Sequence, residues 1–199
     1  MIYDCYDAEK RAILRTADQM AAAARTAPKA SGTDHLYCAI VEGEDKAKLA
    51  AAMRRYGEQW GYDFIRRDGD NVDFAQCVVL LGMIGKPLGL KNCGYCGHES
   101  CGACTKAHSR CAHNVIDLGI AIGSAVSVAA DHRIDNRVLY SAGRVAAEMG
   151  MLPEGVEVAV GIPLSVTSKS PFFDRGSDDG EEMLCRERER RIREMSENA

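Results

Sequence analysis

The chain has 199 residues, 46% of them hydrophobic, which suits one globular domain with a substantial core. Its net charge is −4, with both signs dispersed along the chain, which argues against a nucleic-acid partner or an anionic membrane surface. The N-terminus, MIYDCYDAEKRAILR, has acidic residues before any apolar run and does not resemble a secretory signal. We therefore expect a cytoplasmic protein.

The first half of the chain alternates between helix and strand patterns. In chain order, we expect a helix over residues 7–26, a strand in HLYCAIVEG (35–43), a helix between Ala47 and Trp60, a polar loop in RRDGDN (66–71) and a strand in QCVVLLGMIG (76–85). The helices follow from apolar residues at helical spacing, and Pro28 ends the first of them. The second strand is apolar on both faces, which predicts an interior position in a sheet.

The second half predicts two helices, a strand and a tail. We expect a helix over residues 113–130, a helix from Val138 to Met149, a strand in VEVAVGIP (156–163) and a charged helical tail over 177–199. The apolar run 115–130 is only 16 residues long and contains Asp117, whereas a transmembrane helix needs about 20 apolar residues. We interpret it as a buried core helix, on which Gly119 and Gly123 let another backbone approach closely. Residues 1–176 then form a single domain.

Five of the nine cysteines lie close together, with the spacing Cys93-x2-Cys96-x4-Cys101-x2-Cys104-x6-Cys111. A reducing compartment makes a disulfide framework a poor explanation for them. Zinc takes four ligands, usually from two knuckles that are well separated in the chain, and here the two C-x2-C pairs are only four residues apart. An iron–sulfur cluster is larger, and a glycine-rich loop can wrap around it. The spacing therefore favours a cluster over zinc.

Spacing alone leaves the ligand set open. Cys93, Cys96 and Cys101 are joined either by Cys111 or by Cys104. Three histidines lie close enough in sequence to donate hydrogen bonds to a cluster: His98, His108 and His113. Histidines in such loops are more often solvated. The other thiols carry no motif, and we interpret them as small buried hydrophobes or surface groups: Cys5, Cys38, Cys77 and Cys185.

Several stretches together resemble a family of uncharacterised ferredoxin-domain proteins from anaerobic bacteria and archaea, whose body resembles the nitroreductase fold. The matching stretches are AARTAPKASG (23–32), CGYCGHESC (93–101), CAHNVIDLGIAIGSAVSVA (111–129), DNRVLYSAGRVAAEMG (135–150) and GIPLSVTSKSPFFDR (161–175). The resemblance implies an α+β fold with a central, mainly antiparallel sheet packed by helices, and with a small iron–sulfur-binding loop inserted at 91–112. It also implies a homodimer.

The family pattern C-x2-C-G-x3-C is followed by a more distant cysteine before the DLGIA helix, and Cys111 holds that position. The resemblance thus implies a 4Fe-4S cluster on Cys93, Cys96, Cys101 and Cys111, with Cys104 as the alternative ligand.

Nitroreductases hold a flavin mononucleotide (FMN) across the dimer interface, and the resemblance extends to residues that line it. It implies flavin contacts from Arg25, Pro28, Lys29, Ser31, Gly161, Lys169 and Arg175. The lysines and arginines of this set agree with the assignment, because the phosphate of FMN needs fixed cations near it. The chain departs from the family's pattern, however, because the N-terminal R-S-x-R phosphate anchor and the asparagine after the A-P turn are missing.

The leading interpretation is an FMN-dependent oxidoreductase in which the cluster passes electrons to FMN and on to an unknown acceptor. The acceptor is either a redox partner protein or a small molecule. The alternative is a non-catalytic iron–sulfur electron carrier or redox sensor that lacks flavin. No side chain stands out as a general acid, and Cys104 and Tyr95 are only weak candidates.

Overall fold

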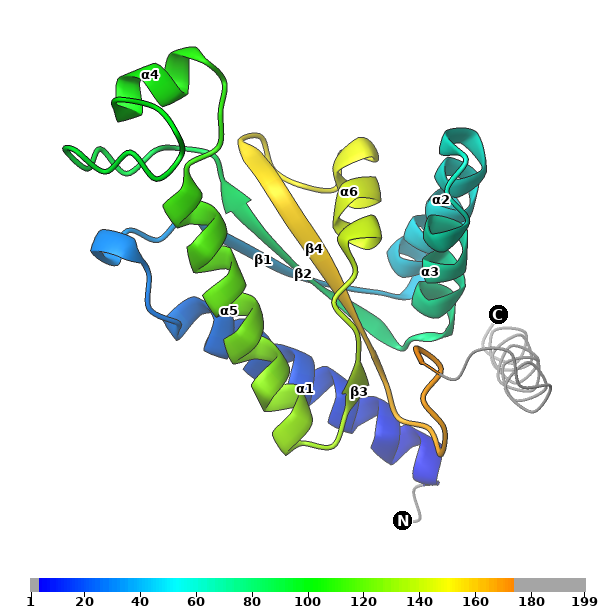
Figure 1. Cartoon of the computed structure of the whole chain (residues 1–199). Coiled ribbons are helices and arrows are strands. Elements are labelled where there is room, and N and C mark those ends of the chain that lie inside the picture. Colours follow the sequence, from blue (N-terminus) through cyan, green and yellow to red (C-terminus); the bar gives the residue numbers. More distant parts are fainter. Residues whose placement is uncertain (1–3, 174–199) are drawn as a thin grey trace.

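The computed structural model describes residues 4–173, and its centre is a four-stranded antiparallel sheet in the order β1-β2-β4-β3 (Figure 1). The strands are β1 (Leu36–Glu42), β2 (Cys77–Ile84), β3 (Asp135–Asn136) and β4 (Val156–Ser165). β2 is central and pairs with β1 along its whole length, from Leu36 opposite Met83 to Glu42 opposite Cys77. The predicted mainly antiparallel sheet is therefore confirmed.

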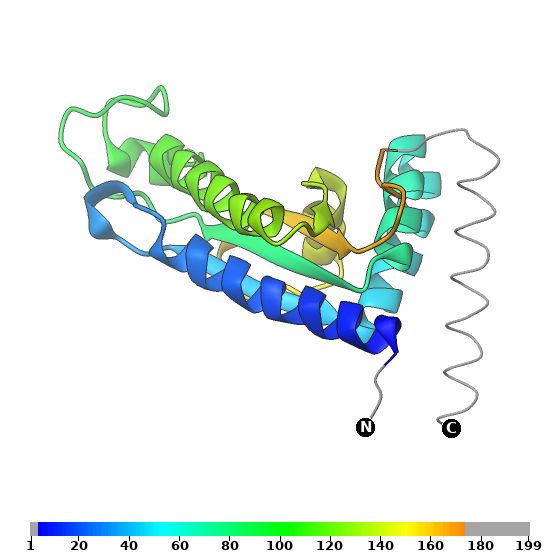
Figure 2. The same cartoon turned by 90° about the horizontal axis from the view of Figure 1, so that it is seen from below.

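Helices cover both faces of the sheet, which gives three layers (Figures 1 and 2). One face carries α1 (Cys5–Thr26) and α5 (Ala112–Asp131), and the other carries α2 (Gly43–Trp60), α3 (Asp63–Phe74) and α6 (Tyr140–Glu148). Alternate residues of β2 enter the two cores: Val79 and Leu81 pack toward α1 and α5, and Val78 and Leu80 toward α2 and α6. Because both faces are buried, β2 is apolar throughout.

One predicted loop is wrong, because RRDGDN (66–71) lies inside α3. The segment is mostly polar, so its helical pattern of apolar residues is hard to recognise. Ile65 and Val72 are two turns apart on α3 and almost fully buried. Gly69 lets α3 approach α2 closely, since a Cβ atom at this position would lie 3.0 Å from the carbonyl oxygen of Ala50. Helix–helix packing, rather than local propensity, therefore determines the structure here.

The helix predicted over 113–130 is confirmed as α5, but it is buried on one face only. Its inner face, with Leu118, Ala121 and Ala125, is buried against α1 and the sheet. Val115, Ile116 and Ile120 on its other face are 41–48% exposed, so a fully buried helix was the wrong expectation. Among the described helices, α5 is the one long and apolar enough to cross a membrane, a property that core helices share.

The cysteine segment projects from one end of the sheet, between β2 and α5 (Figures 1 and 2). We call residues 85–111 the cysteine lobe; it contains the short helix α4 (Cys101–Lys106). The predicted charged tail (177–199) lies outside the described residues.

Candidate functional site

Three elements of the cysteine lobe present its five thiols. Cys93 and Cys96 lie on a loop in which Gly94 and Gly97 take the left-handed conformation, with φ of 65° and 81°, and so reverse the chain tightly. Cys101 and Cys104 are one turn apart on α4, which begins where Ser100 accepts a hydrogen bond from the Ala103 N–H. Cys111 occupies the N-cap position of α5. The loop, α4 and the start of α5 thus each contribute thiols to the cysteine lobe.

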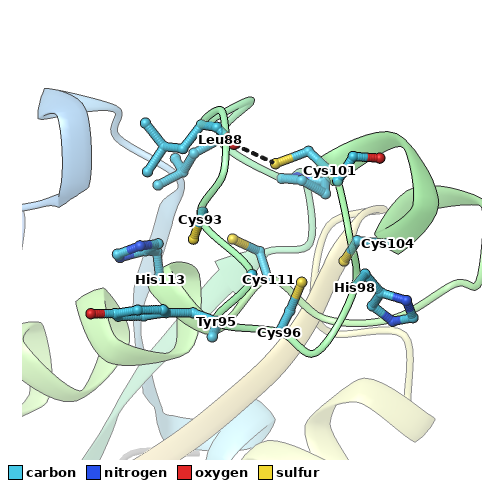
Figure 3. A pocket seen from close by; sticks show the side chains of 14 residues that line it. Leu88, Cys93, Tyr95, Cys96, His98, Cys101, Cys104, Cys111 and His113 are labelled. Atoms are coloured by element: carbon cyan, nitrogen blue, oxygen red, sulfur yellow. Dashed lines mark hydrogen bonds between the residues drawn. The ribbon is translucent and has the colours of Figure 1, made fainter.

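The five cysteines line a common pocket (Figure 3). In the figure, the sulfur atoms of Cys93, Cys96, Cys104 and Cys111 gather in the middle of the view. The Cys101 thiol turns aside toward the carbonyl oxygen of Leu90, 3.8 Å away. All five thiols therefore line one pocket, but the four sulfur atoms that gather in it are those of three predicted ligands and of the alternative, Cys104.

Cys104 is the most deeply buried of the five, with 1% of its surface exposed. Its thiol donates a hydrogen bond of 3.2 Å to the carbonyl oxygen of Ser109. Burial, followed by the neighbouring Cys96, Cys111 and Cys101 thiols, raises the pKa of Cys104 to about 11. Several thiolates so close together would repel one another unless a cation is bound between them. A bound metal would therefore lower the pKa of these thiols and favour the thiolate form.

Within residues 4–173, no group of three or more His, Cys, Asp or Glu side chains is arranged to hold a single metal ion. The five sulfur donors that line the pocket nevertheless exceed the four ligands of one zinc ion. Iron–sulfur clusters are held by cysteine thiolates bound to separate iron atoms, and a ring of thiols on a glycine-rich loop fits them. The chemistry of the donors thus suits a cluster.

Two aromatic side chains stand beside the thiols. Tyr95, between Cys93 and Cys96, stacks on His113 with ring centroids 5.2 Å apart and an interplanar angle of 13°. Both rings line the pocket, as does His98, whereas His108 does not and is exposed. Of the three histidines near the cysteines, two are therefore close to the sulfur atoms.

Asn114, which the sequence analysis missed, fastens α5 to the lobe. It is 3% exposed, and its side-chain amide donates hydrogen bonds to the carbonyl oxygens of Ile84 at 3.0 Å and Lys86 at 2.8 Å. Its oxygen lies 3.3 Å from Nδ1 of His35. One buried side chain thus holds together the start of the lobe, the start of β1 and the first turn of α5. The only hint in the sequence was a polar residue in an apolar helix.

Asp117 makes a second attachment one turn further along α5. Both of its carboxylate oxygens lie 3.0 Å from the backbone N–H of Ala30, in the turn η1 (Ala30–Gly32) between α1 and β1. Asp117 is 4% exposed, so this bond is shielded from water. The predicted flavin turn and the cysteine lobe therefore lie at the same end of α5.

The two cations predicted at that turn are already bonded within it. Arg25 contacts a carboxylate oxygen of Asp34 at 2.6 Å and donates to the carbonyl oxygen of Leu36 at 2.7 Å. Burial alone would raise the pKa of Asp34, but hydrogen bonds from Arg25 and from the Leu36 N–H, with the Arg25 charge, lower it overall. Lys29 donates to three carbonyl oxygens at the end of α1, those of Ala24, Arg25 and Ala27.

The other predicted flavin residues are scattered. Ser31 lies in η1 with a left-handed φ of 56°, and Pro28 lies two residues before that turn begins. Gly161 lies in mid-strand opposite Leu80 on the α6 side of the sheet, where an added Cβ atom would be 2.6 Å from Cβ of Ala142.

The predicted residues beyond β4 lie far from the turn. The segment that follows β4 lies at the end of the molecule where α1 begins (Figures 1 and 2), and it includes the exposed Lys169. The 22 residues of α1, roughly 33 Å of helix, separate that end from Arg25. One chain alone therefore does not assemble these residues, and Arg175 lies outside the described part of the chain.

Outside the lobe, two thiols behave as the sequence predicted. Cys77 is fully buried in the core under α1, and burial raises its pKa to about 12. Cys38 is half-buried and packs against the same core, and burial raises its pKa as well. Cys5 is exposed, and Cys185 falls outside the described residues. Cys77 and Cys38 thus act as small core residues.

Sequence comparison places these features in a family. Residues 107–175 match the family described as uncharacterised proteins containing a ferredoxin domain. A relative from Archaeoglobus fulgidus, itself named an uncharacterised protein, is 43% identical over 164 residues, which is 78% of this chain and 88% of that protein. The chain belongs to this ferredoxin-domain family. The matched segment includes Cys111 but begins after the other four thiols of the lobe.

Solved structures show the fold. The nitroreductase CinD from Lactococcus lactis, in complex with chloramphenicol, has a TM-score of 0.56 at 13% identity and covers 90% of this chain and 87% of its own. A nitroreductase with bound FMN from Desulfitobacterium hafniense has a TM-score of 0.54 at 18% identity and covers 82% of this chain and 85% of its own. The predicted nitroreductase-like fold is therefore confirmed.

Proposed function

We propose that this protein is an iron–sulfur flavoprotein oxidoreductase, in which a 4Fe-4S cluster in the cysteine lobe passes electrons to FMN and on to an acceptor. The observation that carries the proposal is the convergence of five thiols on one pocket at the end of a nitroreductase-like body. The ferredoxin domain of the family supports the redox role.

The protein's own residues supply binding and position. Cys93, Cys96, Cys101 and Cys111 would hold the cluster, and Asn114 fixes the lobe against α5. A cluster supplies one-electron transfer, and a flavin exchanges either one electron or two. Asp117, one turn from Asn114, anchors the turn that we assign to the flavin, so a single helix end positions both regions.

A homodimer would complete the flavin site. The turn with Arg25 and the segment with Lys169 lie at opposite ends of one chain, so a second copy in the reversed orientation would bring them together. The outward face of α5 offers the contact surface, since Val115, Ile116 and Ile120 are exposed and a Cβ atom at Gly119 or Gly123 would meet nothing within 4 Å.

A specific observation favours a second candidate, a carrier or sensor without flavin. The Lys29 ammonium group donates to three carbonyl oxygens, and one terminal nitrogen of Arg25 is held by Asp34 and Leu36, so a flavin phosphate would compete with these bonds. The thiol pocket needs no such displacement, and it would hold a cluster in either case.

Analysis of protein that is purified without oxygen tests the proposal. We expect iron and acid-labile sulfide in equal amounts, a broad brown absorbance, and FMN released on heating. Brown protein without flavin would select the carrier. Colourless protein with stoichiometric zinc, or with no metal, would overturn both candidates.

A further inference from the structure

The cysteine lobe carries a charge opposite to that of the rest of the protein. Four of the 25 Lys and Arg residues lie in it, against one of the 29 Asp and Glu residues. The cations are Lys86, Lys91, Lys106 and Arg110, and the acid is Glu99. The chain as a whole is negative, so this lobe is a positive projection from an acidic body (Figures 1 and 2).

Three of these cations face solvent. Lys86, Lys91 and Lys106 are exposed, and none forms an ion pair with any residue between 4 and 173. Arg110 differs, because its guanidinium lies 3.3 Å from the carboxylate of Glu157 on β4. The three lysines flank the thiols in the chain, two before Cys93 and one at the end of α4.

The same lobe exposes one large aromatic side chain, that of Tyr95. Tyr95 is 71% exposed, although its ring also lines the thiol pocket and stacks on His113. Exposed tyrosines are enriched at protein interfaces, where the ring provides contact area at a low entropic cost. A partner that touches Tyr95 would therefore stand directly beside the sulfur atoms.

These features fit a protein partner better than a small anion. A small anion needs cationic groups that converge on a pocket, and the residues that line the thiol pocket include no Lys or Arg. The three lysines are instead exposed, and none of them lines the pocket. Such a distribution complements a broad acidic surface and steers its approach over a long range.

From these observations we infer that the cysteine lobe is the docking surface for an acidic one-electron carrier protein. The inference rests on the proposed function and adds to it the site and the chemical class of the redox partner. An iron–sulfur centre held by the cysteines of the lobe would accept the one electron that the reduced carrier loses, with no proton moved and no bond broken. Interfaces of this kind are small, weak and sensitive to salt.

Binding of a small acidic ferredoxin, used as the probe, tests the inference without relying on electron transfer. Its dissociation constant for the full-length protein is measured by calorimetry at about 0.01 M and about 0.15 M salt, where the screening length falls from roughly 30 Å to 8 Å. The test variant is Lys86→Gln, Lys91→Gln and Lys106→Gln together. The matched control neutralises three exposed cations of α2 and α3: Lys48→Gln, Arg55→Gln and Arg66→Gln. Both triple variants lose the same charge.

We expect the lobe variant to bind about tenfold more weakly at low salt and the control variant to bind like the wild type. The salt dependence of binding should also flatten in the lobe variant alone. Equal losses in the two variants would contradict the inference, because only net charge would then matter, and no binding by the wild type would also contradict it. Binding without any iron in the protein would leave the docking surface intact and overturn the proposed function instead.

Discussion

Asn114 and Lys86 join the two parts of the molecule, since the Asn114 amide donates a 2.8 Å hydrogen bond to the carbonyl oxygen of Lys86. The same amide donates to Ile84, so replacing Asn114 leaves two carbonyl groups without this partner. We expect Asn114→Ala to lower the free energy of unfolding by about 1–3 kcal/mol, measured by urea denaturation. Hydrogen exchange of the lobe amides should quicken as well.

Gln59→Ala is the control for Asn114→Ala, because it removes an exposed amide from α2. Unchanged exchange within the lobe of the Asn114 variant would show that Asn114 does not hold the lobe. Asn114→Asp separates donor from acceptor, since it keeps an oxygen near His35 but removes both donated bonds. It should destabilise the protein at least as much as Asn114→Ala, because a buried carboxylate would face the carbonyl oxygens of Ile84 and Lys86.

The thiol that completes the ligand set can be identified by its loss. Cys111→Ser should remove the intact cluster, measured as iron per chain and as absorbance of anaerobic protein, because the serine oxygen is a poor ligand for it. Cys104→Ser should keep the iron, although this thiol lines the pocket as well. The opposite pattern would make Cys104 the ligand and leave Cys111 as the extra thiol.

The sequence placed the five cysteines in one segment, but it did not indicate the residues that attach this segment to the rest of the fold. Cysteine spacing is a local signal, so the five thiols were found together. The partners of Asn114 and Asp117 are remote by contrast: Lys86 is 28 residues from Asn114, and Ala30 is 87 residues from Asp117. No periodicity or motif encodes such pairs, because they exist only once the sheet and helices have packed.

The same distinction explains the fold. The unbroken apolar run of β2 predicted an interior strand, since both faces of that strand are covered. The α3 helix was missed because polar residues separate its buried apolar residues, Ile65, Val72 and Phe74, and because Gly69, which allows close packing on α2, is typical of a loop in sequence. The α5 helix was placed correctly, but its exposed face could not be predicted, because both faces of the helix are apolar in sequence.

Close packing against α6 is enough to explain why position 161 is a glycine. Gly161→Ala would push a methyl group to within 2.6 Å of Cβ of Ala142, and we expect a loss of about 1–3 kcal/mol in the free energy of unfolding. Adding Ala142→Gly should remove the clash and restore part of the lost stability. The recovery is incomplete because a glycine inside α6 itself costs about 1 kcal/mol. Flavin content that falls in the single variant and stays low in the double variant would instead indicate a cofactor contact.

Cys77 gives the protein a dependence on alkaline pH. Burial raises the pKa of Cys77 from 9.0 to about 12, so its contribution to stability is complete below pH 9 and is lost as the pH rises toward 12. Between these values, we expect the free energy of unfolding to fall by about 1.4 kcal/mol per pH unit from this group. Urea denaturation of the wild type and Cys77→Ala at pH 8 and pH 10, with reductant, measures the difference. Parallel profiles would contradict it.

The exposed apolar face of α5 predicts the assembly state. Ile116 and Ile120 are 48% and 41% exposed, and a charge there would have to be buried if two copies meet on this face. We expect Ile116→Lys with Ile120→Lys to convert a dimer into a monomer by sedimentation analysis, with an unchanged circular dichroism spectrum and less bound FMN. Tyr62→Lys, at a residue that is 53% exposed beside α3, should remain dimeric. A double variant that still sediments as a dimer would place the subunit contact elsewhere.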